Sequence, residues 1–352
     1  MSERPTLTAD VCAETDRTGQ FGDVTGLAQQ LRDALWRVQT ANLQPRDTPG
    51  GLVIAGMGGA SLGGSLARAA LGDGASRPVA VWRDYGLPGW STPDTTVLCV
   101  SYSGETEETL AAYAAAQALG APRIVLTSGG SLAAQARNDG AGVVSLPGGF
   151  RSRATIGYTV VAALEVARLC GAGESFHADV DVAAEHVAAL AQAWGPDAPE
   201  DSLAKTLARA LHRTVPQIAG AGLTAPVAYR WKTQINSNAK TPAFAAELPE
   251  LDHNELLGWE RARGLGPFSA VFLDDSDLHP RLRQRIELTR GLIAGRGNPT
   301  FRVETIGETR LGRLMSLVLL GDLVSLYLAV LDGVDPAPVE SADSIKAALG
   351  AG

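Results

Sequence analysis

The sequence predicts an α/β protein with two subdomains, each a parallel sheet flanked by helices. Three observations support this prediction. Short apolar runs alternate with helical segments along most of the chain, which is typical of a parallel sheet covered on both faces. The second half of the chain repeats the pattern of the first. The 352 residues, 45% of them hydrophobic, suffice for two cores at about 150 residues per domain.

The expected organisation is a helical segment, two subdomains and a connector between them. We place the N-terminal helical segment at 1–48, the first subdomain at 49–170, the connector at 171–205 and the second subdomain, with a C-terminal helix, at 206–352. The connector contains the turn-rich stretch 195–201, where glycine and proline disfavour regular structure.

In the first half, helices and strands alternate in order. Leucines at helical spacing predict a helix over about 24–38, and the apolar run 52–55 predicts the first strand. Further strands are expected at 79–82, 96–100, 123–126 and 143–146, and helices at 61–70, 105–119 and 131–138.

After the strands of the first subdomain, helices are expected first and a second sheet pattern follows. The helices are expected at 155–170 and 180–215, and residues 216–222 then repeat the strand and glycine turn of 53–58. Strands at 269–273 and 301–306 and helices at 225–239, 280–294 and 310–331 complete the prediction. Because Ser316, Asp322 and Ser325 interrupt its last apolar stretch, we predict a buried helix there, not a membrane span.

Composition excludes several classes of function. Lys+Arg total 30 and Asp+Glu 38, so the net charge of −8 argues against a large nucleic-acid surface. The three cysteines form no CxxC pair, and Cys99 and Cys170 lie in apolar stretches where buried, inert thiols are expected. The five histidines form no metal-binding pair, so we expect neither metal nor cofactor. No apolar signal segment opens the chain, which favours a soluble cytoplasmic protein.

Two glycine- or hydroxyl-rich turns each follow a strand and open a helix. The first spans residues 56–64 and brings backbone NH groups and a helix N-terminus close to an anion. Its glycines are too crowded for a dinucleotide loop, and no Walker-type lysine follows. The second turn carries Ser101, Ser103 and Thr106, whose hydroxyls suit a phosphate dianion without a metal, or else cap the helix. A third turn at 127–131 is expected to cap its helix.

These turns and the two-copy layout resemble the sugar isomerase (SIS) domain proteins. The stretches WKTQINSNAK at 231–240 and ELPELDHNE at 247–255 resemble, more specifically, the bifunctional phosphoglucose/phosphomannose isomerase family. The resemblance covers about residues 50–350. It implies two SIS subdomains of flavodoxin-like three-layer architecture, binding a sugar phosphate between them.

The resemblance also implies roles for individual residues. It places the phosphate on Ser101, Ser103 and Thr106, and the sugar along Gly58 and Gly59. Arg153 would stabilise negative charge on the enediolate oxygens, and Lys346 would act at the ring oxygen. His253 would open the ring by proton transfer and would come from the partner subunit of a homodimer. The alternatives are a surface arginine, a solvated helix lysine and a helix-packing histidine.

The sequence departs from the family pattern at the base that moves a proton between C1 and C2. The family has a glutamate where this chain has Ser237, whose hydroxyl does not ionise usefully at neutral pH. Ala60 also stands where the family usually has serine.

Three interpretations follow from the missing glutamate. The chain is an isomerase whose base is Glu247, Asp252, Glu255 or a water held by Ser237. Otherwise it is a phosphosugar-binding regulator or partner protein, or an enzyme of different chemistry on an amino or activated sugar. The sequence does not separate glucose, mannose and fructose 6-phosphate as ligands.

Overall fold

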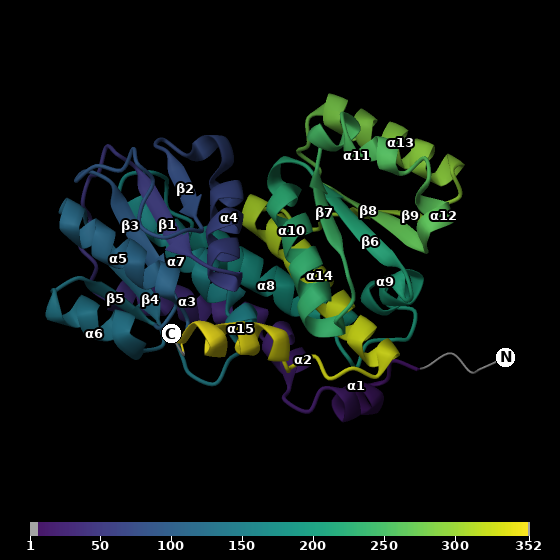
Figure 1. Ribbon diagram of the computed structural model, residues 1–352, viewed down its shortest axis with the longest axis horizontal. Helices are drawn as coiled ribbons and strands as arrows, with labels where there is room; N and C mark the ends of the chain where they lie inside the picture. The colour runs from purple at the N-terminus through teal and green to yellow at the C-terminus, as the bar shows by residue number, and fades with distance from the viewer. Residues whose placement is uncertain (1–5, 351–352) are drawn as a thin grey trace.

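The structure contains two parallel sheets, one in each half of the chain (Figure 1). It is a computed structural model and describes residues 6–350, excluding the side chains of residues 346, 347 and 350. The first sheet has strand order β2-β1-β3-β4-β5 and the second has β7-β6-β8-β9. The second order repeats the first four strands of the first sheet, which confirms the predicted α/β architecture in two copies.

The first sheet lies between helices on both faces. Its strands are β1 (Leu52–Gly56), β2 (Val79–Trp82), β3 (Thr96–Val100), β4 (Arg123–Thr127) and β5 (Gly142–Ser145). The helices are α4 (Gly59–Leu71), α5 (Glu107–Leu119), α6 (Gly130–Asn138) and α7 (Ile156–Leu169). Every residue of β1 and β3 is buried. Central parallel strands covered on both faces bury both sets of side chains, which explains their continuous apolar runs.

The second sheet is smaller and includes a strand that the sequence did not predict. Its strands are β6 (Val215–Gly220), β7 (Phe244–Glu247), β8 (Phe268–Asp274) and β9 (Thr300–Glu304). Its helices are α10 (Ala225–Gln234), α11 (Glu255–Gly258), α12 (Ala262–Leu265), α13 (Pro280–Gly295) and α14 (Arg310–Asp332). The unpredicted strand β7 is an edge strand with Phe244 exposed, so its sequence lacks the apolar run of a central strand.

Two predicted helices differ from those observed. The helix expected over 180–215 is two helices, α8 (His177–Trp194) and α9 (Leu203–Leu211). The intervening turn is held by the buried Lys205, whose Nζ donates to the carbonyls of Pro196 (2.8 Å) and Ala198 (2.6 Å). The helix expected to end at Ala239 is α-helical only to Gln234 and continues as a π-helix, η4 (Ile235–Ala239).

The N-terminal helices and α14 join the two halves. The helices α1 (Ala9–Thr15), α2 (Gln20–Thr25) and α3 (Leu27–Thr40) pack against α7, α8 and α14. One large cluster of buried apolar side chains includes residues from both halves and most of α14. This helix is long and apolar enough to cross a membrane, yet 94% of its most apolar window is buried inside the protein. It is a core helix, as predicted.

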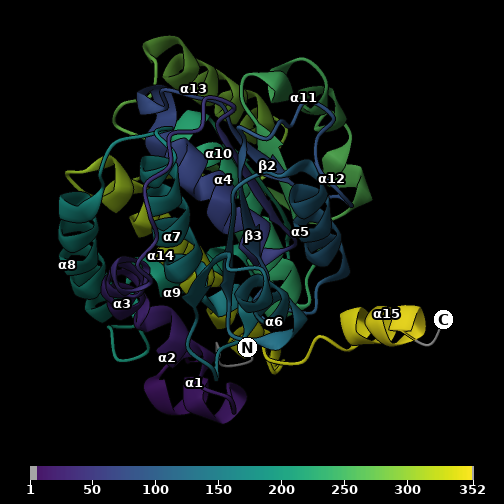
Figure 2. The ribbon, with the colours of Figure 1, turned by 90° about the vertical axis from the view of Figure 1, so that its left-hand side faces the viewer.

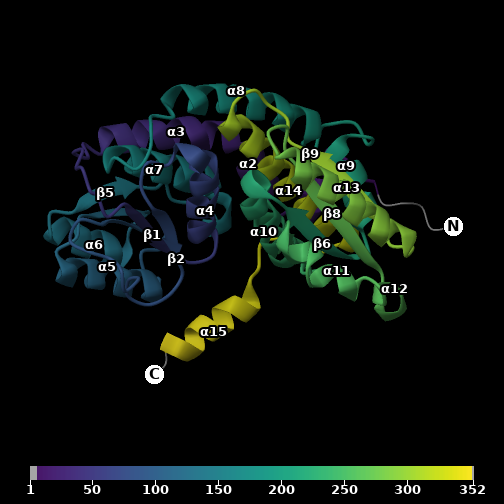
Figure 3. The same cartoon turned by 90° about the horizontal axis from the view of Figure 1, so that it is seen from above.

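The C-terminal helix α15 (Glu340–Gly350) extends away from the body of the protein (Figures 2 and 3). Ile345 and Leu349 on this helix are 64% and 68% exposed. The segment before α15 is different, because Pro336 and Ala337 are buried. A buried segment therefore carries an exposed helix.

The three cysteines are free and buried, as predicted for Cys99 and Cys170. Burial raises the pKa of the Cys99 thiol to about 12. A thiol with so high a pKa is not a nucleophile near neutral pH.

Candidate functional site

The glycine turn after β1 lies against the loop that carries Arg153. Gly58 has φ +55°, which favours glycine because a side chain is strained there. A Cβ on Gly59 would lie 3.2 Å from both the Cα of Arg153 and the carbonyl oxygen of Ser152. The absence of a side chain at Gly59 thus permits the turn to approach the arginine loop closely.

The hydroxyl-rich turn after β3 is adjacent to the glycine turn. The two turns are neighbours because β1 pairs with β3 and Gly56 lies opposite Val100. The Ser101 and Thr106 hydroxyls hydrogen-bond to each other at 2.8 Å, and the Ser101 hydroxyl also accepts from the Gly104 backbone NH. Thr106 occupies the N-cap position of α5, but its side chain makes no capping hydrogen bond. The helix-capping alternative therefore does not describe Thr106.

The acidic residue of this turn points to a different helix. The Glu105 carboxylate accepts from the Ser131 backbone NH (2.7 Å) and hydroxyl (2.8 Å) at the start of α6. These hydrogen bonds lower the pKa of Glu105. The Glu105 carboxylate is thus hydrogen-bonded to Ser131 of the third turn, at 127–131, and makes no described hydrogen bond to the hydroxyls of the second turn. Ser103 accepts the Glu105 backbone NH at 3.2 Å.

Arg153 lies where the two halves of the protein meet. The Tyr102 hydroxyl donates to the Pro147 carbonyl (3.1 Å) and accepts from the Phe150 backbone NH (3.0 Å), which ties the arginine loop to the hydroxyl-rich turn. Arg153 itself donates through Nε to Asn238 Oδ1 at 2.9 Å and through Nη2 to the Pro336 carbonyl at 2.7 Å. Burial, reinforced by Arg151 and Arg230, lowers the pKa of the half-buried Arg153.

A closed network of hydrogen bonds fixes Arg153 against the second half. Asn238 Nδ2 donates to Ser325 (2.9 Å), and the Ser325 hydroxyl donates to the Asp322 carbonyl (2.6 Å). The Asp322 carboxylate accepts from Arg230 Nε at 2.9 Å and Nη2 at 2.5 Å.

Arg230 Nη2 completes the network by donating to the Arg153 carbonyl at 3.1 Å. Arg230 is 0% exposed and Asp322 is 3% exposed. The network thus links the first half, the π-helix and α14 around a buried ion pair.

Ser237 lies in the π-helix beside Asn238 and is half-buried. Lys240 follows with a left-handed backbone (φ +56°). Its ammonium donates to the Ser237 carbonyl and, at 3.2 Å, to the Pro336 carbonyl. Burial, and then Arg153, lowers the pKa of Lys240. The structure therefore brings Ser237, Lys240 and Arg153 together around one short C-terminal segment.

His253 and the neighbouring acids lie elsewhere, at the β7 edge of the second sheet. His253 follows the short helix η5 (Glu250–Asp252) and is exposed. Among residues 6–350, the structure gives no hydrogen bond or ion pair between His253 and the residues around Arg153. Asp252 is held by Arg285 (2.9 Å) and Thr289 (2.7 Å). Burial, and then Glu250, raises the pKa of Glu255, and Glu247 is exposed at the end of β7.

Lys346 lies on α15, and its side chain is outside the described part of the structure. Within the described residues there is no group of three or more histidine, cysteine or acidic side chains that could hold a metal ion. The residues that can bind a ligand here are hydroxyls, backbone NH groups and cations.

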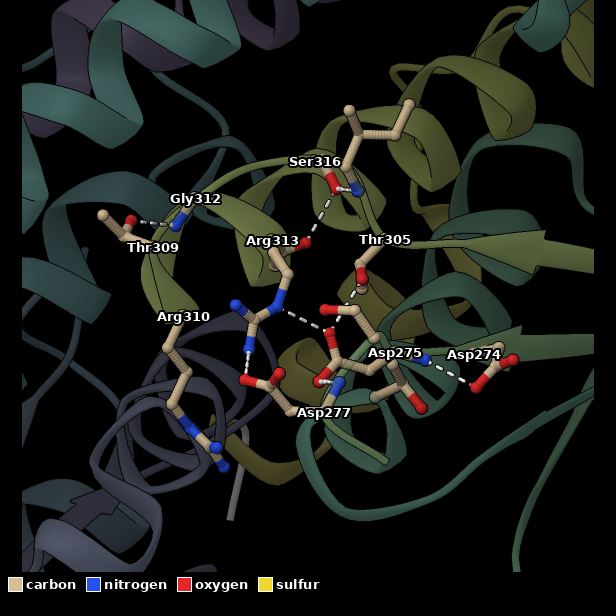
Figure 4. Close-up of polar contacts among 12 residues, drawn as sticks. Asp274, Asp275, Asp277, Thr305, Thr309, Arg310, Gly312, Arg313 and Ser316 are labelled. Atoms are coloured by element: carbon tan, nitrogen blue, oxygen red, sulfur yellow. Dashed lines mark hydrogen bonds and ion pairs between the residues drawn. The ribbon is translucent and has the colours of Figure 1, made fainter. Parts of the chain in front are cut away.

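The carboxyl edge of the second sheet has a different character, although its strands repeat those of the first. Arg313 Nε donates to Asp275 at 2.8 Å and its Nη2 to Asp277, and the Thr305 hydroxyl donates to Asp275 at 2.7 Å (Figure 4). Arg313 and Asp275 are 6% and 3% exposed. Internal ion pairs thus occupy this edge, whereas the glycine turn and the hydroxyl-rich turn lie at the carboxyl edge of the first sheet.

Sequence reasoning missed Arg230, Asn238, Asp322 and Ser325. A signal for two of them exists: Asp322 and Ser325 are three residues apart in an apolar helix, and so lie on one face. Polar residues that share a face of a buried helix indicate a polar partner, here Arg230 and Asn238.

Comparison with known proteins gives one consistent family. Residues 200–349 match the model of the bacterial phospho-glucose isomerase C-terminal SIS domain. The chain is 38% identical over 331 residues to a bifunctional phosphoglucose/phosphomannose isomerase of Caldicellulosiruptor bescii, covering 93% of this chain and 97% of that protein. It is 33% identical over 301 residues to the protein of the same name from Aquifex aeolicus, covering 85% and 90%.

Two further similarities are more limited. The chain is 34% identical over 165 residues to a D-glucosamine-6-phosphate 4-epimerase of Sulfolobus acidocaldarius, covering 46% of this chain and 50% of that protein. A solved Thermus thermophilus protein described as hypothetical shares the fold with TM-score 0.72 at 19% identity, covering 97% and 93% of the two chains.

Proposed function

The chain belongs to the bifunctional phosphoglucose/phosphomannose isomerase family, and from this premise we propose that it is an aldose–ketose isomerase of hexose 6-phosphates. It interconverts glucose 6-phosphate, mannose 6-phosphate or both with fructose 6-phosphate through a cis-enediol. The observation that carries this proposal is the meeting of the two anion-binding turns with Arg153 at the junction of the two halves.

In the proposed complex, the sugar phosphate binds across these turns. Ser101, Ser103, Thr106 and the backbone NH groups at the start of α5 hold the phosphate, and the sugar lies along Gly58 and Gly59. Hydroxyls and helix NH groups bind a phosphate dianion through charge-assisted hydrogen bonds, with no metal required.

Proton transfer is divided among residues of two subunits. His253 of one chain opens the sugar ring in the site of its dimer partner. This placement is supported by the exposure of His253, which makes no described hydrogen bond or ion pair with the Arg153 site of its own chain. Lys346 acts at the ring oxygen. Arg153 stabilises the enediolate as negative charge develops on its oxygens.

The proposed mechanism needs a base that moves the proton between C1 and C2. At the position where the resemblance places this base, the chain has Ser237. Asp252 is a poor candidate because Arg285 and Thr289 already engage its carboxylate. We propose a water held at Ser237, with Glu247 and Glu255 as the remaining carboxylates. A water without a positioned carboxylate is a weak base, so we expect isomerisation on the order of 10²–10⁴-fold slower than with glutamate.

A second candidate function is a phosphosugar-binding protein without isomerase activity. It is favoured by Ser237, whose hydroxyl makes no described hydrogen bond to a carboxylate or imidazole. The limited similarity to an epimerase of an amino-sugar phosphate makes glucosamine 6-phosphate a useful additional ligand in the test.

NMR in D₂O tests the proposal. Purified protein is incubated with mannose 6-phosphate or fructose 6-phosphate, and deuterium at C1 and C2 is followed together with interconversion. An isomerase that works through a cis-enediol exchanges the proton that it moves between C1 and C2 with solvent. Arg153→Gln should abolish exchange, whereas Arg151→Gln, the same charge change at an exposed neighbour, should not.

Thermal melting with the same ligands separates the alternatives. A ligand-dependent rise in Tm without deuterium incorporation would favour the binding protein. If the hexose phosphates cause no deuterium exchange and no rise in Tm, both functions are contradicted. A response to glucosamine 6-phosphate alone would indicate different chemistry.

A further inference from the structure

A cation stands beside the glycine turn that the isomerase proposal does not use. Arg83 follows the end of β2, at the same edge of the sheet as the two anion-binding turns. Its Nε donates to the Ser61 hydroxyl at 2.9 Å and its Nη2 to the Ser65 hydroxyl at 2.7 Å, both on α4. Two hydrogen bonds to neighbouring turns of one helix fix the orientation of the guanidinium.

A second cation, from the other half of the protein, shares an aromatic ring with Arg83. Tyr229 on α10 is 43% exposed. Lys232 Nζ lies 4.6 Å from the centre of its ring, and Arg83 Cζ lies 5.9 Å from it. The helices α4 and α10 are in contact, so both positive charges lie within about a Debye length of each other.

These two charges lack an anionic partner. Among the described residues, no carboxylate lies within ion-pairing distance of Arg83 or Lys232, whereas some arginines of each half are ion-paired, as in Arg77–Asp47 and Arg230–Asp322. Two unneutralised like charges held close together repel each other, and an anion placed between them removes that repulsion.

The pair is directly connected to the proposed sugar-lining turn. The Ser61 hydroxyl that accepts from Arg83 donates to the Gly58 carbonyl at 3.0 Å. Arg83 follows β2 and Ser101 follows β3, with β1 between them. The two strand ends are therefore two interstrand spacings apart, about 10 Å, a span that a six-carbon sugar phosphate bridges.

We propose that Arg83 and Lys232 bind a second phosphate group, on the end of the sugar opposite the 6-phosphate. The inference rests on the proposed function, because it takes the 6-phosphate to lie on Ser101 and Thr106. The ligand class is a hexose bisphosphate, which binds as an inhibitor or regulator of the isomerase site. Free inorganic phosphate has the same chemistry, and the experiment separates these two sources.

Isothermal titration calorimetry with three ligands tests the proposal: fructose 1,6-bisphosphate, fructose 6-phosphate and inorganic phosphate. The bisphosphate should bind about tenfold or more tightly than the monophosphate, since it adds charge-assisted contacts. Arg83→Gln and Lys232→Gln should each remove about tenfold of the bisphosphate affinity and leave the monophosphate affinity within about twofold. Arg32→Gln on α3, an exposed arginine without a described ion pair, is the matched control.

The outcomes distinguish this inference from the isomerase proposal. If monophosphate and bisphosphate bind equally, or if neither substitution at Arg83 or Lys232 matters, the inference is wrong while the phosphate site at Ser101 stands. If only the bisphosphate binds, and does so through Arg83, the placement of the 6-phosphate on Ser101 is contradicted, and the inference that rests on that placement falls with the proposed function. Binding of inorganic phosphate alone through Arg83, with no gain for the bisphosphate, overturns the sugar-linked second phosphate. Unchanged melting of each variant excludes misfolding.

Discussion

Ser237 is the residue at which the sequence is expected to depart from the family pattern, and its surroundings make that expectation testable. It lies in a π-helix directly before Asn238, which fixes Arg153, and three residues before Lys240, which binds the same C-terminal segment as Arg153. π-Helical turns often occur at functional sites. The π-helix is compatible with the proposed role of position 237, where the side chain is a serine and not a carboxylate.

We predict that Ser237→Glu raises isomerase activity by about 10²-fold or more, because a carboxylate at this position restores a positioned base. The rate of fructose 6-phosphate formation from mannose 6-phosphate measures it. Ser237→Gln, which has the same length without the charge, is the control and should give no increase. An equal rate for both variants would contradict the assignment of the base to this position.

The buried Arg230–Asp322 ion pair is connected to Arg153, because Arg230 donates a hydrogen bond to the Arg153 carbonyl. Removing one partner leaves an uncompensated buried charge, so we predict that Arg230→Met lowers the free energy of unfolding by about 3–5 kcal/mol. Urea unfolding measures this loss.

The double variant Arg230→Met with Asp322→Leu separates packing from positioning. Replacing both charges with apolar side chains of similar size should recover most of the stability. It does not restore the hydrogen bond to the Arg153 carbonyl, so kcat should stay about tenfold or more below that of the parent protein. Full recovery of both quantities would mean that the pair is only structural.

At the scale of single elements, the packing of α10 on the core helix α14 depends on one tryptophan and one glycine. Trp231 of α10 is fully buried and donates through Nε1 to the Leu317 carbonyl of α14 at 2.8 Å. It fits because α14 has a glycine beneath it: a Cβ on Gly321 would overlap the indole ring of Trp231. The contact sets how closely α10, and with it the π-helix, approaches α14.

We therefore predict that Gly321→Ala lowers the free energy of unfolding by about 2 kcal/mol or more, since a packed core does not absorb the extra methyl group. Gly291→Ala on α13 is the control, because its Cβ would meet nothing within 4 Å. That substitution should stabilise the protein by about 0.5–1 kcal/mol through helix propensity. Chemical denaturation measures the free energy of unfolding of both variants. Equal changes for Gly321→Ala and Gly291→Ala would contradict the close packing of Trp231 on Gly321.

At the scale of the whole molecule, the proposed site is incomplete within one chain. Arg153 and the glycine turn meet at the junction of the halves, beside the hydroxyl-rich turn, whereas His253 lies exposed at the β7 edge of the second sheet. A symmetric dimer can bring such separated surfaces together, because each interface contributes the same residues to both partners. A homodimer with His253 supplied in trans remains a prediction.

Mixing two inactive variants tests shared sites. His253→Ala and Arg153→Gln should each abolish exchange of the C2 proton, and mixed dimers should recover up to about a quarter of the parental activity per site in the mixture. The measurement is deuterium exchange after the variants have been allowed to exchange subunits. Mixed dimers confirmed by size and mass, yet inactive, would show that His253 does not act across the interface.

The sequence alone predicted the doubled α/β architecture, nearly all strands, and the positions of the glycine turn after β1 and the hydroxyl-rich turn after β3. These features depend on local patterns: apolar runs of strand length, helical spacing, and glycine or hydroxyl residues where a strand ends. The edge strand β7 escaped because it is half-exposed, and the π-helix escaped because a single extra residue in a turn leaves helical periodicity almost unchanged.

Only the tertiary structure decided which residues act together. The sequence determined that Ser237 is not a glutamate and that Arg153 precedes a helix. It could not show that Asn238, Ser325, Asp322 and Arg230 form one network around Arg153, or that Arg83 and Lys232 share the ring of Tyr229. These partners lie far apart in sequence. The physical reason is that local patterns fix elements, whereas the burial and pairing of polar groups depend on how distant elements pack.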